Sequence, residues 1–232
     1  RFILLTILCC LVLSISAQIA RDEIFEDIYT LAGYRAGEIQ LESLKLLPGT
    51  EMRHRADELG IRYSPLPPYE VLQTGEISVG ELQTARRLSR LLDAFYNTPA
   101  WQELTRELIL NDRRFLYRFL AYLTEANLID QPMSLERRGL VLYEYCKQYY
   151  PDYRTQASIA WIEAGMSLKK LPAEHVKTKR QIPPEHWEVI YGNYKPELRL
   201  CFLPVSTDTE HGYWFGFESE IQKIAPVFKA RT

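Results

Sequence analysis

The chain has 232 residues, of which 47% are apolar and 25% charged, and its formal net charge is −2 at pH 7. This composition is typical of a globular protein with one or two domains. The balanced charge excludes a global positive field that would attract nucleic acid, so a polyanion would need a local patch. The cysteines are Cys9, Cys10, Cys146 and Cys201, which have neither zinc spacing nor the density of a disulfide scaffold.

Residues 1–20 form a hydrophobic N-terminal segment, in which Arg1 is the only charged residue. A basic start, an apolar stretch over residues 2–13 and small residues over 14–17 are typical of a secretory signal peptide. The segment is also long enough for a membrane helix. A buried strand, or the end of a fragment, would have the same composition, so these alternatives stay open.

Residues 38–60 predict a strand, a turn and a helix. The apolar residues of a short run predict a buried strand, and they are Ile39, Leu41, Leu44, Leu46 and Leu47. Pro48-Gly49 ends the strand, and Thr50 is suited to cap a short helix that runs to Gly60. Because a helix is also predicted over residues 22–31, the pattern favours a parallel α/β arrangement with its site at the strand's C-terminal end.

A proline-rich connection follows, with Pro65, Pro67 and Pro68. Each proline fixes its own φ and disfavours helix at the preceding residue, so the connection is extended and stiff. We therefore predict a domain boundary here, between residues 21–66 and residues 67–232.

Residues 67–232 are predicted to be mainly helical. A capping box at Ser78 and Glu81 opens the first helix, and Thr98-Pro99 opens the next. Further helices are predicted after Asp112, after Ser134 and over residues 159–168. The first helix carries three arginines that lie mostly off its apolar stripe, Arg86, Arg87 and Arg90. A solvated helix face explains them better than a phosphate-binding patch does.

The C-terminal part changes to strand periodicity. Residues 174–184 are predicted to be a polar linker. Residues 198–203 and 213–217, joined by the polar residues 206–212, predict an antiparallel β-hairpin, with Val227-Phe228 as a third strand. A lone hairpin is marginally stable, so this one should pack against the helices.

Catalytic motifs are not found in the sequence. The histidines make no H-E-x-x-H pair, and the chain contains no Walker loop, nucleophile elbow or G-x-G-x-x-G fingerprint. We therefore predict no catalytic residue and no metal ligand within these residues, and Cys146 and Cys201 are interpreted as small core residues.

An ordered set of motifs resembles a known family. Gln40-Leu41, the run LKLLPGTEM at 44–52, Gly60 and the run PPYEVL at 67–72 resemble the late barrel and C-terminal region of cobalamin-binding-type radical SAM proteins. Residues 91–97, ending in Phe95-Tyr96-Asn97, and the run YWFGF at 213–217 look like the C-terminal domain of unknown function attached to that family. The resemblance covers residues 22–232.

The resemblance implies a partial TIM-type barrel with a four-iron four-sulfur cluster and S-adenosylmethionine, preceded by a cobalamin-binding domain. The chain has neither the family's C-x-x-x-C-x-x-C motif nor a recognisable cobalamin-binding histidine motif, and residues 16–20 depart from its glycine-rich turn. We therefore expect a C-terminal fragment, or the product of a disrupted reading frame, that is inactive alone. Its partner would be the missing N-terminal part of the same protein. Its substrate is an unidentified small molecule, and its use of cobalamin is left open.

On this interpretation the fold is the α/β edge of a partial TIM-type barrel, followed by a mainly α-helical domain with a small C-terminal antiparallel β-hairpin. Barrel geometry and the resemblance make Lys45, Pro48, Gly49, Thr50 and Tyr69 the candidates for facing S-adenosylmethionine or substrate. A plain turn with a solvated lysine explains these residues equally well.

The sequence is therefore consistent with two functions. The first is the C-terminal part of a radical SAM enzyme, which would be cytoplasmic, without nucleic acid or membrane as a partner. The second is a secreted or membrane-tethered helical interaction module, which depends on residues 1–20 and on the aromatic-rich helices.

Overall fold

The computed structural model describes residues 23–171, 176–178, 199–205, 208–217, 226 and 228–231. The chain divides into two compact units, Arg1–Pro132 and Met133–Thr232. The hydrophobic segment predicted at 1–20 lies outside the described residues, and the boundaries predicted at 20–21 and 66–67 stay predictions. Within the described ranges, no helix is both long and apolar enough to cross a membrane.

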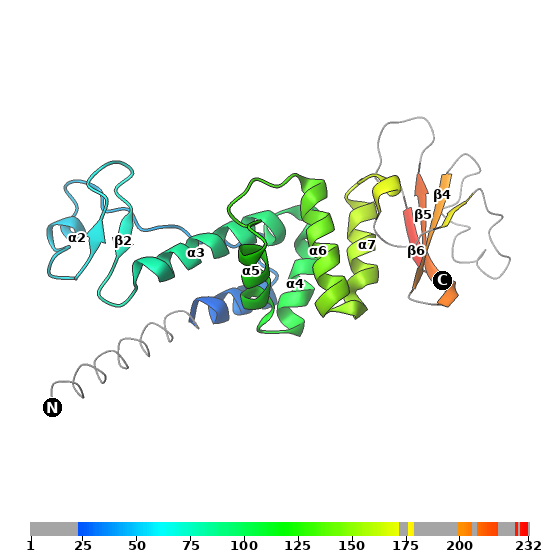
Figure 1. The fold of residues 1–232 in the computed structure, drawn as a ribbon, viewed down its shortest axis with the longest axis horizontal. Helices are drawn as coiled ribbons and strands as arrows, with labels where there is room; N and C mark the ends of the chain where they lie inside the picture. The colour runs from blue at the N-terminus through cyan, green and yellow to red at the C-terminus, as the bar shows by residue number, and fades with distance from the viewer. Residues whose placement is uncertain are drawn as a thin grey trace, which may run out of the picture. The chain divides into compact units, whose positions relative to one another are not determined.

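The described part of the first unit begins with helical residues 23–33, in which Ile28 and Ala32 are buried four positions apart, as expected for one helix face. A short helix, α2 (Glu51–His54), and two strands, β1 (Arg62–Tyr63) and β2 (Val71–Gln73), follow an irregular segment (Figure 1). The two strands pair antiparallel.

The buried strand predicted over 39–47 is wrong. Lys45 forms one isolated antiparallel bridge with Glu70, and the pairings seen among the described strands are all antiparallel. Ile39 and Leu46 are buried, whereas Leu44 and Leu47 are about half exposed. The predicted helix also ends early, at His54, and turns continue to Gly60, whose φ of 63° suits a glycine.

Three helical segments form the centre of this unit. The helix α3 (Val79–Leu91) begins at the predicted capping box, where Ser78 accepts from the Glu81 backbone and the Glu81 carboxylate accepts from the Ser78 N–H at 2.9 Å. It continues as a π-helical segment, η1 (Leu92–Tyr96). The helix α4 (Pro99–Asn111) has proline at its first position, as predicted, and α5 (Phe115–Glu125) follows.

Aromatic side chains fill the core between these segments. The rings of Phe95 and Phe119 meet edge to face at 4.9 Å, and Phe115 stacks on Phe119 at 5.4 Å. All three are fully buried. Their predicted role as packing residues is confirmed, because ring pairs of this geometry add to the free energy of burial.

Residues 36–39 are fixed by side chains and not by a neighbouring strand. Asn97 donates from Nδ2 to the Ile39 carbonyl at 2.9 Å and accepts the Ile39 N–H at Oδ1, also at 2.9 Å. The Tyr96 hydroxyl donates to the Ala36 carbonyl at 2.7 Å. Because buried backbone groups need partners, these bonds let an irregular segment lie against η1.

The second unit begins with helices. The helix α6 (Leu135–Tyr149) starts at Ser134, which caps it as predicted. A short η2 (Pro151–Tyr153), α7 (Arg154–Glu163) and η3 (Leu168–Lys170) follow. The Trp161 indole donates to the Ser167 carbonyl at 3.1 Å, which fixes the turn after α7.

A four-stranded antiparallel sheet completes the second unit, in the order β3 (Val176–Thr178), β4 (Arg199–Val205), β5 (Asp208–Phe217) and β6 (Phe228–Arg231). The predicted hairpin is confirmed as β4 and β5, and Phe228 starts the predicted third strand, whereas residue 227 is not described. The polar linker predicted over 174–184 is wrong at 176–178, because these residues pair with β4.

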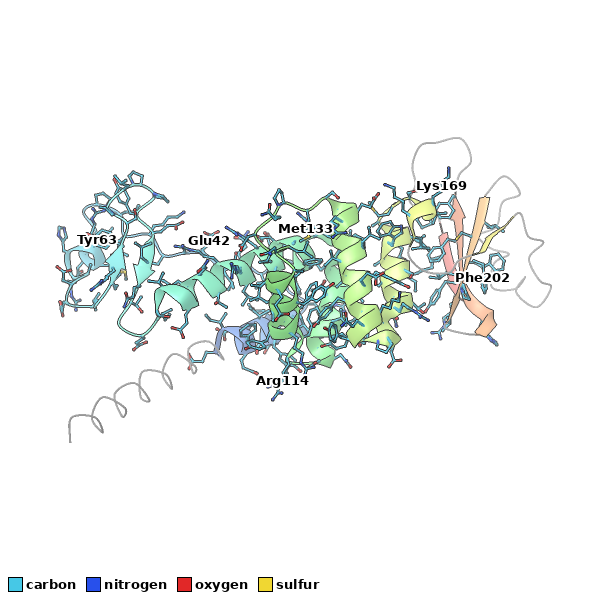
Figure 2. All side chains as sticks on the ribbon, in the orientation of Figure 1. Glu42, Tyr63, Arg114, Met133, Lys169 and Phe202 are labelled. Atoms are coloured by element: carbon cyan, nitrogen blue, oxygen red, sulfur yellow. The ribbon has the colours of Figure 1, made fainter. Side chains whose placement is uncertain are left out.

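The sheet packs tightly at the hairpin. Phe202 lies on β4 (Figure 2). Its ring contacts the Trp214 ring across the strand pair, with ring centroids 4.9 Å apart. A side chain at Gly212 would come within 2.6 Å of the Phe202 ring, so glycine is required there. The helix α7 contacts β4, as expected for a hairpin that needs helical support. The predicted fold class, mainly helical with a C-terminal antiparallel hairpin, is thus confirmed.

We expect Asn97→Ala to lower the free energy of unfolding of the first unit by about 2 kcal/mol, because it leaves both backbone groups of Ile39 without their partner. Denaturant titration monitored by tryptophan fluorescence measures this change. Asn111→Ala, at an exposed position on the end of α4, is the control and should change stability by less than about 0.5 kcal/mol. Equal effects of the two variants would contradict the assignment.

Candidate functional site

The predicted site residues all fall in residues 44–77, which we call the lobe. Its core is small and consists of Leu46, Ala56 and Val71. The Leu46 N–H donates to the Tyr69 carbonyl and the Val71 N–H to the Leu44 carbonyl, both at 2.9 Å. Two extended segments on either side of the proline run are thereby held together.

The lobe brings Lys45 and Tyr69 onto neighbouring segments. Lys45 is exposed, and its backbone forms the isolated β-bridge with Glu70, the residue after Tyr69. Tyr69 is half-buried and has a left-handed φ of 61°, which is uncommon for a bulky residue. The residue that carries the ammonium group, Lys45, is therefore paired with the residue next to Tyr69, which carries the aromatic ring.

Pro48, Gly49 and Thr50 form the turn that leads into α2. Gly49 has a φ of 81°, and Thr50 is the predicted N-cap, which accepts from the Arg53 N–H at 3.4 Å. The Thr50 hydroxyl also donates to the Leu47 carbonyl at 2.8 Å. These residues therefore shape the chain, and the Thr50 hydroxyl is already engaged within it.

Arg53 is a central residue that sequence reasoning missed. Its guanidinium carbon lies 4.8 Å from the ring centroid of Tyr69 and 4.9 Å from that of Tyr63, and its Nη1 donates to the Leu46 carbonyl at 3.0 Å. Tyr63 lies in the lobe, as Figure 2 shows. A sequence pattern could have indicated this cluster: Tyr63 and Tyr69 flank the proline run, and Arg53 lies in the helix that precedes it.

A salt bridge joins the lobe to α3. Arg86 donates from Nη2 to Glu70 at 2.9 Å and to the Val71 carbonyl at 3.4 Å. Glu70 is thus tied to α3, next to Lys45 and Tyr69. The lobe is held by side-chain contacts on this side as well as by its own small core.

A cleft of about 220 Å³ lies beside this salt bridge, between β2, α3 and the segment after α5. We call it the arginine cleft. Its lining residues are Leu72, Val79, Leu82, Gln83, Arg86, Arg87, Arg90 and Asp130. The solvated face that we predicted for the three arginines is therefore a concave surface.

Asp130 holds two of these arginines. Arg87 donates to its Oδ2 from Nε at 3.0 Å and from Nη2 at 2.7 Å, and Arg90 donates to its Oδ1 at 2.6 Å. The hydrogen bond from Arg87, together with the charges of Arg87 and Arg90, lowers the pKa of Asp130 below its ordinary value. Asp130 therefore stays ionised to a lower pH than an ordinary aspartate does.

The cysteines in the described part of the chain do not fit an iron–sulfur cluster. Cys146 and Cys201 are both buried, and burial raises the pKa of the Cys146 thiol to about 12. A cluster is ligated by thiolates, which such burial disfavours. Across the described ranges, no group of three or more histidine, cysteine or acidic side chains is arranged to hold a metal ion.

Comparison with known proteins gives one family match. Residues 57–168 match the family described as "Protein of unknown function (DUF4080)". The match begins in the turns after α2, includes the arginine cleft and ends at the start of η3. No curated protein and no solved structure matches the chain.

We expect Arg53→Met to loosen the lobe locally, because methionine keeps an apolar stem but loses both ring contacts and the hydrogen bond to Leu46. Contacts of this kind contribute about 0.5 to 1 kcal/mol each. Hydrogen exchange at the Leu46 and Val71 amides should accelerate about tenfold. Arg55→Met, in an exposed ion pair, is the control and should leave these amides unchanged. Unchanged exchange in Arg53→Met would show that the lobe does not depend on this contact.

We expect the Asp130 carboxyl to titrate below the ordinary value of about 3.9 in an NMR pH titration. Arg87→Gln should raise its pKa, because that variant removes the largest cause of the shift. The lowered pKa means that Asp130 stabilises the fold at neutral pH and that this contribution is lost as the pH falls through that lowered pKa. Arg118→Gln, which removes a partner of Asp112, should leave the Asp130 titration unchanged.

Proposed function

We propose that the chain is the C-terminal part of a radical SAM enzyme of the cobalamin-binding type, in which it supplies barrel wall and substrate enclosure. The observation that carries the proposal is the overlap of two signals. The ordered motifs of residues 38–72 and 91–97 overlap the family match over residues 57–168. The resemblance places a domain of unknown function at the C-terminal end of such proteins, and the matched family is likewise described as one of unknown function.

Exposed apolar side chains in and beside the lobe support this proposal. Of the twelve large hydrophobic residues that are exposed in the described part of the chain, seven lie within residues 44–79, and they are Leu44, Leu47, Met52, Leu59, Leu66, Leu72 and Val79. Their exposure reaches 70% at Leu66. A concentration of exposed apolar residues is typical of a surface that contacts further protein. We place the barrel of the preceding part of the protein against these side chains.

Within this enclosure, Lys45 and Tyr69 are the residues we propose to face substrate or S-adenosylmethionine. An exposed ammonium can pair with a carboxylate or phosphate, and an aromatic ring can stack on a planar group. Pro48, Gly49 and Thr50 would shape the adjoining turn. The four-iron four-sulfur cluster, S-adenosylmethionine and any cobalamin would be bound by the preceding part of the protein, so the chain alone should be inactive.

The test is the native protein, purified anaerobically with an antibody against the second unit. We expect a species larger than the 27.1 kDa of this chain, with bound iron and sulfide, that converts S-adenosylmethionine to 5′-deoxyadenosine under reducing conditions. The recombinant 232-residue chain is the control and should have none of these properties.

The opposite result would favour the secreted or membrane-tethered helical interaction module. In that case the native species would have the mass of this chain, or a mass reduced by about 17 residues after signal cleavage. It would contain no iron and would be found outside the cytoplasm. Such a result would overturn the proposal.

A further inference from the structure

The arginine cleft carries more positive charge than the carboxylates around it balance. Arg86, Arg87 and Arg90 line it with one carboxylate, Asp130. Glu70, which is not among the lining residues, pairs with Arg86. Three guanidinium groups thus face two carboxylates, which leaves a positive charge on a concave surface of a protein whose formal net charge is −2.

The guanidinium groups keep donors for a ligand. An arginine has five N–H donors, and the bonds to Asp130 use Nε and Nη2 of Arg87 and Nη1 of Arg90. Because Asp130 binds both arginines, it also limits the directions in which they point. Arg86 and Arg90 are four residues apart on one helix, a spacing at which like charges repel, so a bound anion would relieve this repulsion.

Part of the lining of the cleft is apolar. Leu72 and Val79 are 40% and 59% exposed, and Leu82 is half-buried. An apolar group that is bound beside the arginines would remove these side chains from water, which favours binding in proportion to the area covered. The cleft therefore suits a ligand with an anionic end and an apolar end.

We propose that the arginine cleft binds a phosphate monoester that carries a small apolar or aromatic group. A phosphate has up to about two negative charges at pH 7 and three strong acceptor oxygens, so it matches several guanidinium forks better than a carboxylate does. A cleft of about 220 Å³ is below the usual range for drug-sized ligands, which limits the apolar group to about the size of one ring. This assignment does not depend on the proposed radical SAM function.

The experiment is a calorimetric titration of the full chain with phenyl phosphate in a low-salt, phosphate-free buffer. We expect saturable binding that weakens as salt is added, because salt screens exposed charges. Inorganic phosphate should bind about tenfold more weakly because it lacks the ring, and phenylacetate about tenfold more weakly because it has a single charge. No saturation, or an affinity for inorganic phosphate or for phenylacetate that equals the affinity for phenyl phosphate, would overturn the proposal.

Two cleft variants and one matched control locate the site. Arg90→Gln and Arg86→Gln should each weaken phenyl phosphate binding about tenfold, since each removes one charged donor. Arg118 is the matched control, because its exposure of 54% and its pairing with Asp112 resemble the 58% and the Asp130 pairing of Arg90. Arg118→Gln should leave the affinity unchanged.

Far-ultraviolet circular dichroism verifies that each variant keeps its helices. Arg86 pairs with Glu70 and not with Asp130, so Arg86→Gln carries the test if Arg90→Gln unfolds. Wild-type affinity in a folded Arg86→Gln or Arg90→Gln protein would place the phosphate elsewhere and overturn the assignment.

Discussion

The paired hydrogen bonds between Asn97 and the backbone of Ile39 are the contact on which the first unit depends. Residues 36–39 have no strand partner. Their carbonyls at Ala36, Gly37 and Ile39 accept instead from the side chains of Tyr96, Gln102 and Asn97. The two preceding residues also contribute: Phe95 packs in the aromatic core, and the Tyr96 hydroxyl donates to the Ala36 carbonyl. The Phe95-Tyr96-Asn97 motif is therefore structural: it fastens the chain that leads into the lobe.

The lobe reached by this segment is held by few apolar contacts. Its core is small, and Arg53 between two tyrosine rings supplies part of its cohesion. Most of the large apolar side chains of residues 44–79 face outward. A body that buries so little of its own apolar surface gains by packing against further protein, which is the role we propose for it beside a barrel.

The arginine cleft would gain free energy from a different source. Contact with a barrel would bury apolar area, whereas binding in the cleft would neutralise charge. Leu72 and Val79 belong to both surfaces, since they line the cleft and are also among the exposed apolar residues. The two proposals can fail separately, because iron and enzymatic activity test one and phosphate affinity tests the other.

The sequence by itself determined the helix starts at Ser78, at Pro99 and after Ser134, and the alternation of the terminal hairpin. These signals are local, because a cap or a strand period involves residues within a few positions. It also singled out Lys45 and Tyr69. Only the tertiary structure decided that residues 39–47 form no strand and that Arg53 lies between two rings. It also brought Asp130 to Arg87, 43 residues away. Such contacts depend on packing between distant segments, which leaves no periodic pattern in the chain.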